Sequence, residues 1–174
     1  MRKQQKGFSL IELLIVVAII LIIAAIAIPN LMRAKMAAND SSAAAGERTI
    51  VTGEVGYNAA YPTIGYTSLL ALGGVAPCTP SSAGACLIDQ NLASNGNGNN
   101  AAAGTAGKSG YQFAAVAGAS ALTQFLTTAT PTSNSSGTKL YCAVEDGVVR
   151  SNTFTGAPAA IVDASCYTTS PLQN

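Results

Sequence analysis

The sequence predicts an α+β protein in which one long N-terminal helix packs on a C-terminal antiparallel sheet of three or four strands. Three observations predict this fold class. An apolar run from Phe8 to Ile28 continues past Pro29 into an alanine-rich segment that ends before Pro62. Short segments rich in β-branched and aromatic residues follow position 110. Between these two parts the composition shifts to Pro, Gly, Ser and Asn, which is typical of loops.

The apolar run is long enough to cross a membrane. Its twenty-one residues, Phe8 to Ile28, are all apolar or small except Ser9 and Glu12. At about 1.5 Å of rise per residue, a helix of this length matches a hydrocarbon core about 30 Å thick. An ionised side chain costs about 2.5–3.5 kcal/mol at the centre of such a segment and less near an interface. The presence of a carboxylate, Glu12, in this segment therefore needs a physical explanation.

Basic residues flank the apolar run on both sides. Arg2, Lys3 and Lys6 cluster before it, and Arg33 and Lys35 follow it. The numbers of basic residues on the two sides are too similar to decide the orientation of the segment. The first cluster is tight, however, and the first membrane segment usually sets the topology. We therefore predict a cytoplasmic N-terminus.

Two kinds of processing are compatible with this N-terminus. A secretory signal has an apolar region of about 7–15 residues before a small-x-small cleavage site, and Ala25-Ile26-Ala27 fits that site. The apolar region before it is too long, however, and it carries Glu12. A cut after Gly7 instead keeps the apolar run in the mature protein, and this is the interpretation that we adopt.

Residues 6–13, with the sequence KGFSLIEL, resemble the prepilin processing motif of type IV pilins and type II secretion pseudopilins. The resemblance is dense for about thirty residues, as far as Pro29, and loose afterwards. It implies that a membrane aspartic prepilin peptidase cuts after Gly7 and that Phe8 becomes an N-methylated N-terminus. It also implies that Glu12 guides subunit assembly and that the helix loosens at Pro29 in a filament.

The chemistry of the residues agrees with the assembly role of Glu12. After the cut, Phe8 carries an α-amino group, and Glu12 lies four residues along the same helix face. An amine and a carboxylate attract strongly at low dielectric, whereas either alone is costly there. Between neighbouring subunits, this pair could set the axial register. The alternative is a carboxylate at the membrane interface without a partner.

The helix is predicted to continue over residues 8–61. Pro29 should remove one backbone hydrogen bond and kink or locally melt the helix. Pro62 should end it, because the residue before a proline is driven out of the α region. The second half has one packing stripe at three- and four-residue spacing, formed by Ile50, Gly53, Tyr57 and Tyr61.

The predicted organisation has three parts, a leader of residues 1–7, the helix 8–61, and a head of residues 62–174. The head begins with a loop region, 62–110, in which Tyr66–Leu72 forms a short helix or strand. Its second part, 111–174, forms the sheet. The expected strands are Tyr111–Val116, Leu122–Thr127, Lys139–Val144 and Val148–Phe154. Asp146-Gly147 is a turn dipeptide that predicts a hairpin between the last two strands.

All four cysteines follow the apolar run, which indicates two disulfides in an oxidising compartment. Three connectivities are possible, and we favour local pairing of Cys78 with Cys86 and of Cys142 with Cys166. The alternative of a cysteine metal site lacks a C-x₂-C spacing, and the chain has no His.

Other chemical signals are weak, and we expect no enzymatic activity and no cofactor. Residues 102–109 resemble a relaxed phosphate loop, but coil precedes them and a strand follows, whereas a phosphate loop needs a buried strand before it and a helix that starts at its lysine. Asp89, Asp146 and Asp163 could bind Ca²⁺, as the resemblance to pseudopilins suggests. No D-x-D-x-D run is present, so we interpret them as solvated turn carboxylates. The net charge of +1 does not indicate nucleic-acid binding.

The resemblance implies a structural subunit of a type IV pilus, held in the inner membrane and then polymerised with copies of itself into an extracellular filament. Its implied partners are the prepilin peptidase and methylase and an inner-membrane assembly platform with a motor ATPase. One alternative is a major pseudopilin that forms a short periplasmic piston. Another is a membrane-anchored binding module that never polymerises. Two disulfides and a loop-rich head favour the pilus, while adhesion, motility and DNA uptake stay open.

Overall fold

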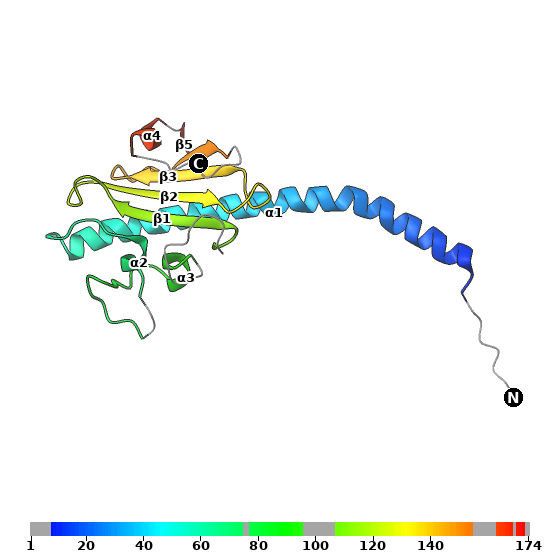
Figure 1. Ribbon diagram of the computed structural model, residues 1–174, viewed down its shortest axis with the longest axis horizontal. Helices are drawn as coiled ribbons and strands as arrows, with labels where there is room; N and C mark the ends of the chain where they lie inside the picture. Colours follow the sequence, from blue (N-terminus) through cyan, green and yellow to red (C-terminus); the bar gives the residue numbers. More distant parts are fainter. Residues whose placement is uncertain (1–7, 75–76, 96–106, 155–162, 169, 173–174) are drawn as a thin grey trace. The chain divides into compact units, whose positions relative to one another are not determined.

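The computed structural model describes residues 8–74, 77–95, 107–154, 163–168 and 170–172. The chain divides into two compact units, Met1–Lys35 and Met36–Asn174. Helix α1, Leu10–Ala60, contributes its first half to one unit and its second half to the other. The second unit, which we call the head, also contains a five-stranded sheet (Figure 1). This is the predicted α+β class.

Helix α1 has 51 residues and is continuous through Pro29. Of the two effects expected at Pro29, a kink or local melting, local melting does not occur. The proline ring removes one donor, so the carbonyl of Ala25 loses its usual helical partner, but a single missing bond does not interrupt a long helix. The helical hydrogen bonding reaches as far as Tyr61, whose N–H donates to the Tyr57 carbonyl at 2.8 Å. The end before Pro62 is as predicted.

The sheet is an antiparallel meander with the strand order β1-β2-β3-β4-β5. It has one strand more than predicted, because the short segment β5 adds to the edge of β4. The predicted start of the second strand at Leu122 was wrong. The Ser120 carbonyl accepts the N–H groups of both Thr123 and Gln124, at 3.0 and 2.8 Å, so Leu122 lies in a helical turn. The strands are β1 Tyr111–Ala117, β2 Phe125–Pro131, β3 Lys139–Val144, β4 Arg150–Thr153 and β5 Ser170–Pro171.

The main core of the head lies between the second half of α1 and the strands β1 to β3 (Figure 1). Two short helices, α2 (Leu69–Leu72) and α3 (Gln90–Ala93), complete it. Glycines on α1 allow close packing, since a Cβ on Gly46 would lie 2.9 Å from the Phe113 ring. The largest buried apolar side chains of this core are Ile50, Tyr57, Leu72, Leu92, Tyr111 and Phe125.

A smaller core contains buried side chains from the strands and from helix α4, Asp163–Tyr167. Leu126 of β2 and Val144 of β3 pack there with the disulfide between Cys142 and Cys166. The disulfide joins β3 to α4 across 24 residues. Closing a loop of this length stabilises a fold by about 3 kcal/mol.

Asn95 covers part of the free edge of β1. Its side-chain amide donates to the Phe113 carbonyl and accepts from the Phe113 N–H, both at 2.6 Å. Asn95 has φ +51°, a conformation that asparagine tolerates better than most residues. The side chain thus takes the place of a neighbouring strand, which protects an apolar edge from pairing with other chains.

We expect Asn95→Gly to destabilise the head by about 2 kcal/mol, because two buried backbone groups lose their partners. Glycine keeps the positive φ without strain, so the loss of stability reports the side-chain amide of Asn95 alone. The urea midpoint of the full chain in detergent measures it, with Asn91→Ala at the exposed neighbouring position as the control. An unchanged midpoint for Asn95→Gly would contradict this role.

Candidate processing and assembly segment

The structure describes one of the two predicted processing residues, Phe8, close to the start of α1. Gly7 lies outside the described residues. Phe8 precedes the helix, and the residue is 85% exposed. Ser9 occupies the N-cap position, because α1 begins at Leu10. A residue just before a helix and exposed to solvent is accessible to modifying enzymes.

Glu12 bonds to the backbone of its own helix terminus. The Ser9 N–H donates to Oε2 of Glu12 at 2.9 Å, and the Leu13 N–H donates to the Ser9 carbonyl at 3.2 Å. The S-x-x-E pattern with this bond is that of a capping box. A carboxylate at the third helical position also lies at the positive end of the helix dipole. The sequence-based prediction did not include this capping role, although the S-x-x-E spacing signals it.

The capping bond occupies one oxygen of Glu12. No hydrogen bond to the second oxygen, Oε1, is found among the described residues. A carboxylate can accept several hydrogen bonds. Glu12 can therefore cap its own helix and still accept a bond from an amine on another molecule.

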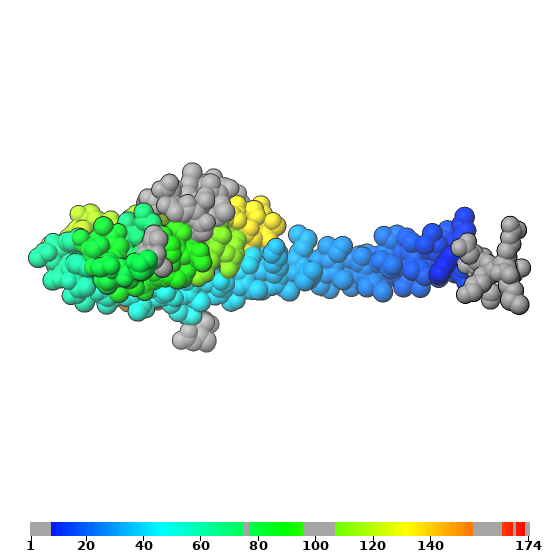
Figure 2. All heavy atoms as spheres, turned by 90° about the horizontal axis from the view of Figure 1, so that it is seen from below, coloured from blue at the N-terminus to red at the C-terminus, as the bar shows by residue number. Residues whose placement is uncertain are grey.

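The first unit exposes almost all of its apolar side chains (Figure 2). An 18-residue window of α1 has a mean hydropathy of 3.3, and none of that window is buried, so this helix is long and apolar enough to cross a membrane. Full burial of one large aliphatic side chain is worth about 1.5–3 kcal/mol. The six side chains that line an apolar groove on one face of α1 are Leu10, Leu13, Leu14, Val17, Ala18 and Leu21.

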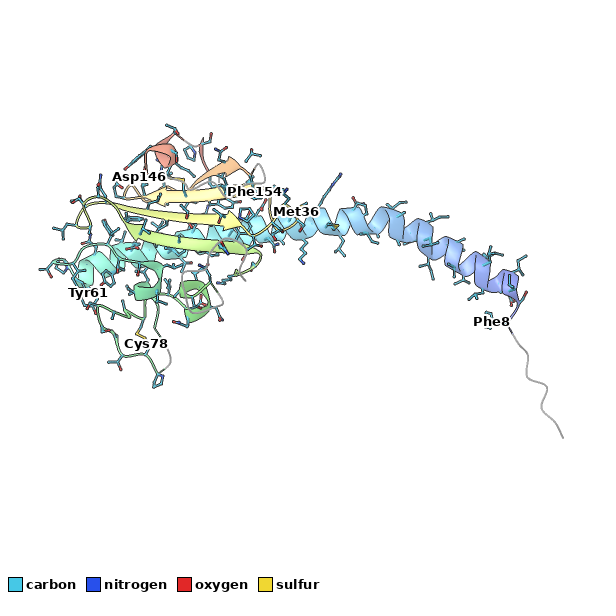
Figure 3. All side chains as sticks on the ribbon, in the orientation of Figure 1. Phe8, Met36, Tyr61, Cys78, Asp146 and Phe154 are labelled. Carbon is cyan, nitrogen blue, oxygen red and sulfur yellow. A yellow bond between two sulfur atoms is a disulfide. The ribbon has the colours of Figure 1, made fainter. Side chains whose placement is uncertain are left out.

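The two disulfides have the local pairing that the sequence favours. Cys78 bonds Cys86 in the connection between α2 and α3, where its sulfur is visible in Figure 3. Cys142 bonds Cys166 in the smaller core. Each disulfide therefore closes a short loop within the head.

Two of the three calcium candidates are engaged in local structure. Asp89 caps α3 by accepting the Leu92 N–H at 3.1 Å, and its other oxygen lies 3.5 Å from Nζ of Lys108. Asp146 pairs with the guanidinium of Arg150, which holds the pKa of Asp146 below its usual range. The side chain of Asp163 lies outside what the structure describes. Among the residues with described side chains, no three carboxylate, His or Cys groups gather into a metal site.

Comparisons with known proteins agree with the geometry of this segment. Residues 2–28 match the family model of the prokaryotic N-terminal methylation motif. A stretch of 39 residues is 62% identical to the type IV wide pilus major component PilA4 of Thermus thermophilus. The match covers 22% of this chain and 30% of that protein. No solved structure matches the chain significantly. The N-terminal segment of this chain is therefore similar to that of type IV pilins, and the similarity covers less than a third of the matched relative.

Proposed function

We propose that this chain is the major structural subunit of a type IV pilus. In this proposal the precursor crosses the inner membrane once with its N-terminus in the cytoplasm. It is cut after Gly7, N-methylated at Phe8, and polymerised through its N-terminal helices. One observation carries the proposal: the methylation motif of residues 2–28 runs directly into an apolar helix whose side chains the chain itself leaves exposed.

The exposed apolar helix needs an environment that covers it. Lipid covers such a helix in the precursor, and copies of the same helix can cover it in a filament. The groove residues recur at three- and four-residue spacing from Leu10 to Leu21, which is the spacing of a helix-packing face. Self-association of these helices would bury the groove without a second kind of protein.

Glu12 gives this packing a preferred register. The new α-amino group of Phe8 in one subunit can donate to the free oxygen of Glu12 in a neighbour. At low dielectric a charged hydrogen bond is worth more than in water, and an unpaired carboxylate is costly. The name of the matched relative, a wide pilus major component, also favours a pilus over a periplasmic piston.

Processing is the first step of the proposal, and intact mass tests it. The full chain is expressed with a prepilin peptidase, and membranes are analysed by mass spectrometry. We expect a mature chain that begins at Phe8 and carries one additional methyl group. Gly7→Leu should leave the precursor uncut while insertion continues, because a branched side chain at the cut position does not fit where glycine does. An unprocessed wild-type chain, or a chain cut after Ala27, would contradict the proposal.

A further inference from the structure

Two carboxyl groups lie fully buried in the head, and they are not among the residues proposed for processing or assembly. Glu47 and Glu54 are both 0% exposed. They lie seven residues apart on α1, which is about two helical turns, so both belong to the face that packs on the sheet. Within the described parts of the chain, both oxygens of Glu47 and Oε1 of Glu54 have no hydrogen-bond partner. A buried oxygen without a partner is unusual in a native fold.

The surroundings of Glu47 are nearly apolar. Thr127 of β2, which is itself 0% exposed, is the polar side chain that acts on it. The Thr127 hydroxyl, however, donates to the Ala143 carbonyl at 3.3 Å, which leaves Glu47 without a firm partner. The neighbouring Gly46 lies against the ring of Phe113 and the side chain of Leu92. An ionised carboxylate in this position would lose its hydration with little in return.

One hydrogen bond compensates weakly for the lost hydration of Glu54. Its Oε2 accepts the Thr67 N–H, at 3.1 Å, from the connection between α1 and α2. The adjacent Gly53 lies against Ile88 and Leu72, which are apolar. A single neutral donor does not replace the hydration shell of a carboxylate.

Burial shifts the acidity of both groups in the same direction. Loss of hydration raises the pKa of Glu47 from 4.5 to about 8, although the nearby Thr127 hydroxyl opposes the shift. The same cause raises the pKa of Glu54 from 4.5 to about 7, against the bond from Thr67. Both groups therefore hold a proton in the folded head at mildly acidic pH.

No described charged group offsets these shifts. The charged side chains that the structure describes in the head either pair elsewhere or are exposed. The phenols of Tyr111 and Tyr141 lie beside Asp40, Asp89 pairs with Lys108, and Asp146 pairs with Arg150. The exposed ones are Arg48 of α1, Lys139 of β3 and Glu145 after β3.

We propose that the head is a pH-responsive unit, which packs α1 on the sheet around Glu47 and Glu54 in their neutral, protonated form. Loss of these protons in alkaline solution places two unpaired charges in the helix–sheet interface and loosens it. This property goes beyond the proposed role as a filament subunit and does not depend on it, because it concerns the fold of the head.

The direction of the pH effect follows from proton linkage. Both folded pKa values lie above the unfolded value, so the folded state binds more protons and stability falls as pH rises. The contribution of these two groups to stability is complete below about pH 4.5, their unfolded pKa. It declines up to about pH 7 for Glu54 and about pH 8 for Glu47, and levels off above these values.

Urea unfolding of the full chain in detergent, at pH values from 5 to 9, tests the proposal. As pH rises from 5 to 7, each group increases the unfolding constant by up to about tenfold per pH unit. Both groups together therefore increase it by more than tenfold per pH unit at the start of this range. The double variant Glu47→Gln, Glu54→Gln is neutral and nearly isosteric, and its unfolding constant should be almost independent of pH. Glu145→Gln, at an exposed carboxylate, should keep the wild-type slope.

Two outcomes would overturn the proposal. One is a wild-type unfolding constant that does not change between pH 5 and 7, and the other is a double variant with the wild-type slope. If the double variant does not fold, proton uptake by the wild-type chain gives an independent answer. Refolding at pH 6 in a weakly buffered indicator solution should take up one to two protons per chain, and no uptake would be contradictory.

Discussion

Glu12→Ala should abolish filament formation while processing and membrane insertion continue. The alanine variant removes the carboxylate that would receive the α-amino group of Phe8 in a neighbouring subunit. It also removes the capping bond from the Ser9 N–H. Loss of a cap costs about 1 kcal/mol, which is small for a helix of 51 residues. We therefore expect at least a hundredfold loss of shear-released subunit, with unchanged amounts of processed chain in membranes.

Glu12→Gln is the matched control for the charge. Glutamine also serves at the third position of a capping box, so this variant keeps the bond to Ser9 and loses only the negative charge. If the ion pair with a neighbour drives assembly, Glu12→Gln should fail as Glu12→Ala does. Wild-type amounts of filament from Glu12→Gln would show that Glu12 acts as a helix cap and would refute the pairing.

Asp40→Ala should be the most destabilising substitution in the head. The Asp40 carboxylate accepts the Tyr111 hydroxyl at 2.5 Å, the Thr138 N–H at 3.0 Å and the Thr138 hydroxyl at 2.5 Å. These bonds tie α1 to β1 and to the residue before β3. Hydrogen bonds to a charged group are worth about 1.5–3 kcal/mol each. Because solvent restores some of them, we expect a total loss of about 3–5 kcal/mol in unfolding free energy.

The contribution of Asp40 can be separated by two further variants. Tyr111→Phe removes one of the three bonds and should cost about 1–2 kcal/mol. Ser41→Ala changes an exposed neighbour on the same helix and should leave the urea midpoint almost unchanged. An Asp40→Ala midpoint close to that of Ser41→Ala would contradict the role of the carboxylate as the main polar link between helix and sheet.

Local patterns in the sequence were sufficient for the helix and the hairpin, and they favoured the disulfide pairing without excluding the other connectivities. The apolar run and Pro62 define α1, and the Asp146-Gly147 dipeptide lies at the turn between β3 and β4. The start of β2 was misplaced because Leu122 has strand-like character but lies in a turn held by Ser120. Strand β5 has only two residues, and its pairing with β4 depends on tertiary structure rather than on local preference.

Contacts between distant residues were beyond the reach of sequence patterns. Asp40 and Thr138 are 98 positions apart, and neither residue type indicates the other. Glu47 and Glu54 are a different case. They continue the stripe of Ile50 and Tyr57 at three- and four-residue spacing, so their burial was readable from position. Charge alone would place them on the solvent side instead, because carboxylates are rarely buried without a partner.

The central claim, that the chain is a pilus subunit built on its N-terminal helix, is tested most directly by the N-terminal mass of shear-released material. Cells expressing the full chain with its processing enzymes and assembly platform are sheared, and the released filaments are analysed by electron microscopy and mass spectrometry. We predict surface filaments composed of this chain, beginning at an N-methylated Phe8. Processed chain found only as monomers in membranes, or only in short periplasmic assemblies, would contradict the claim.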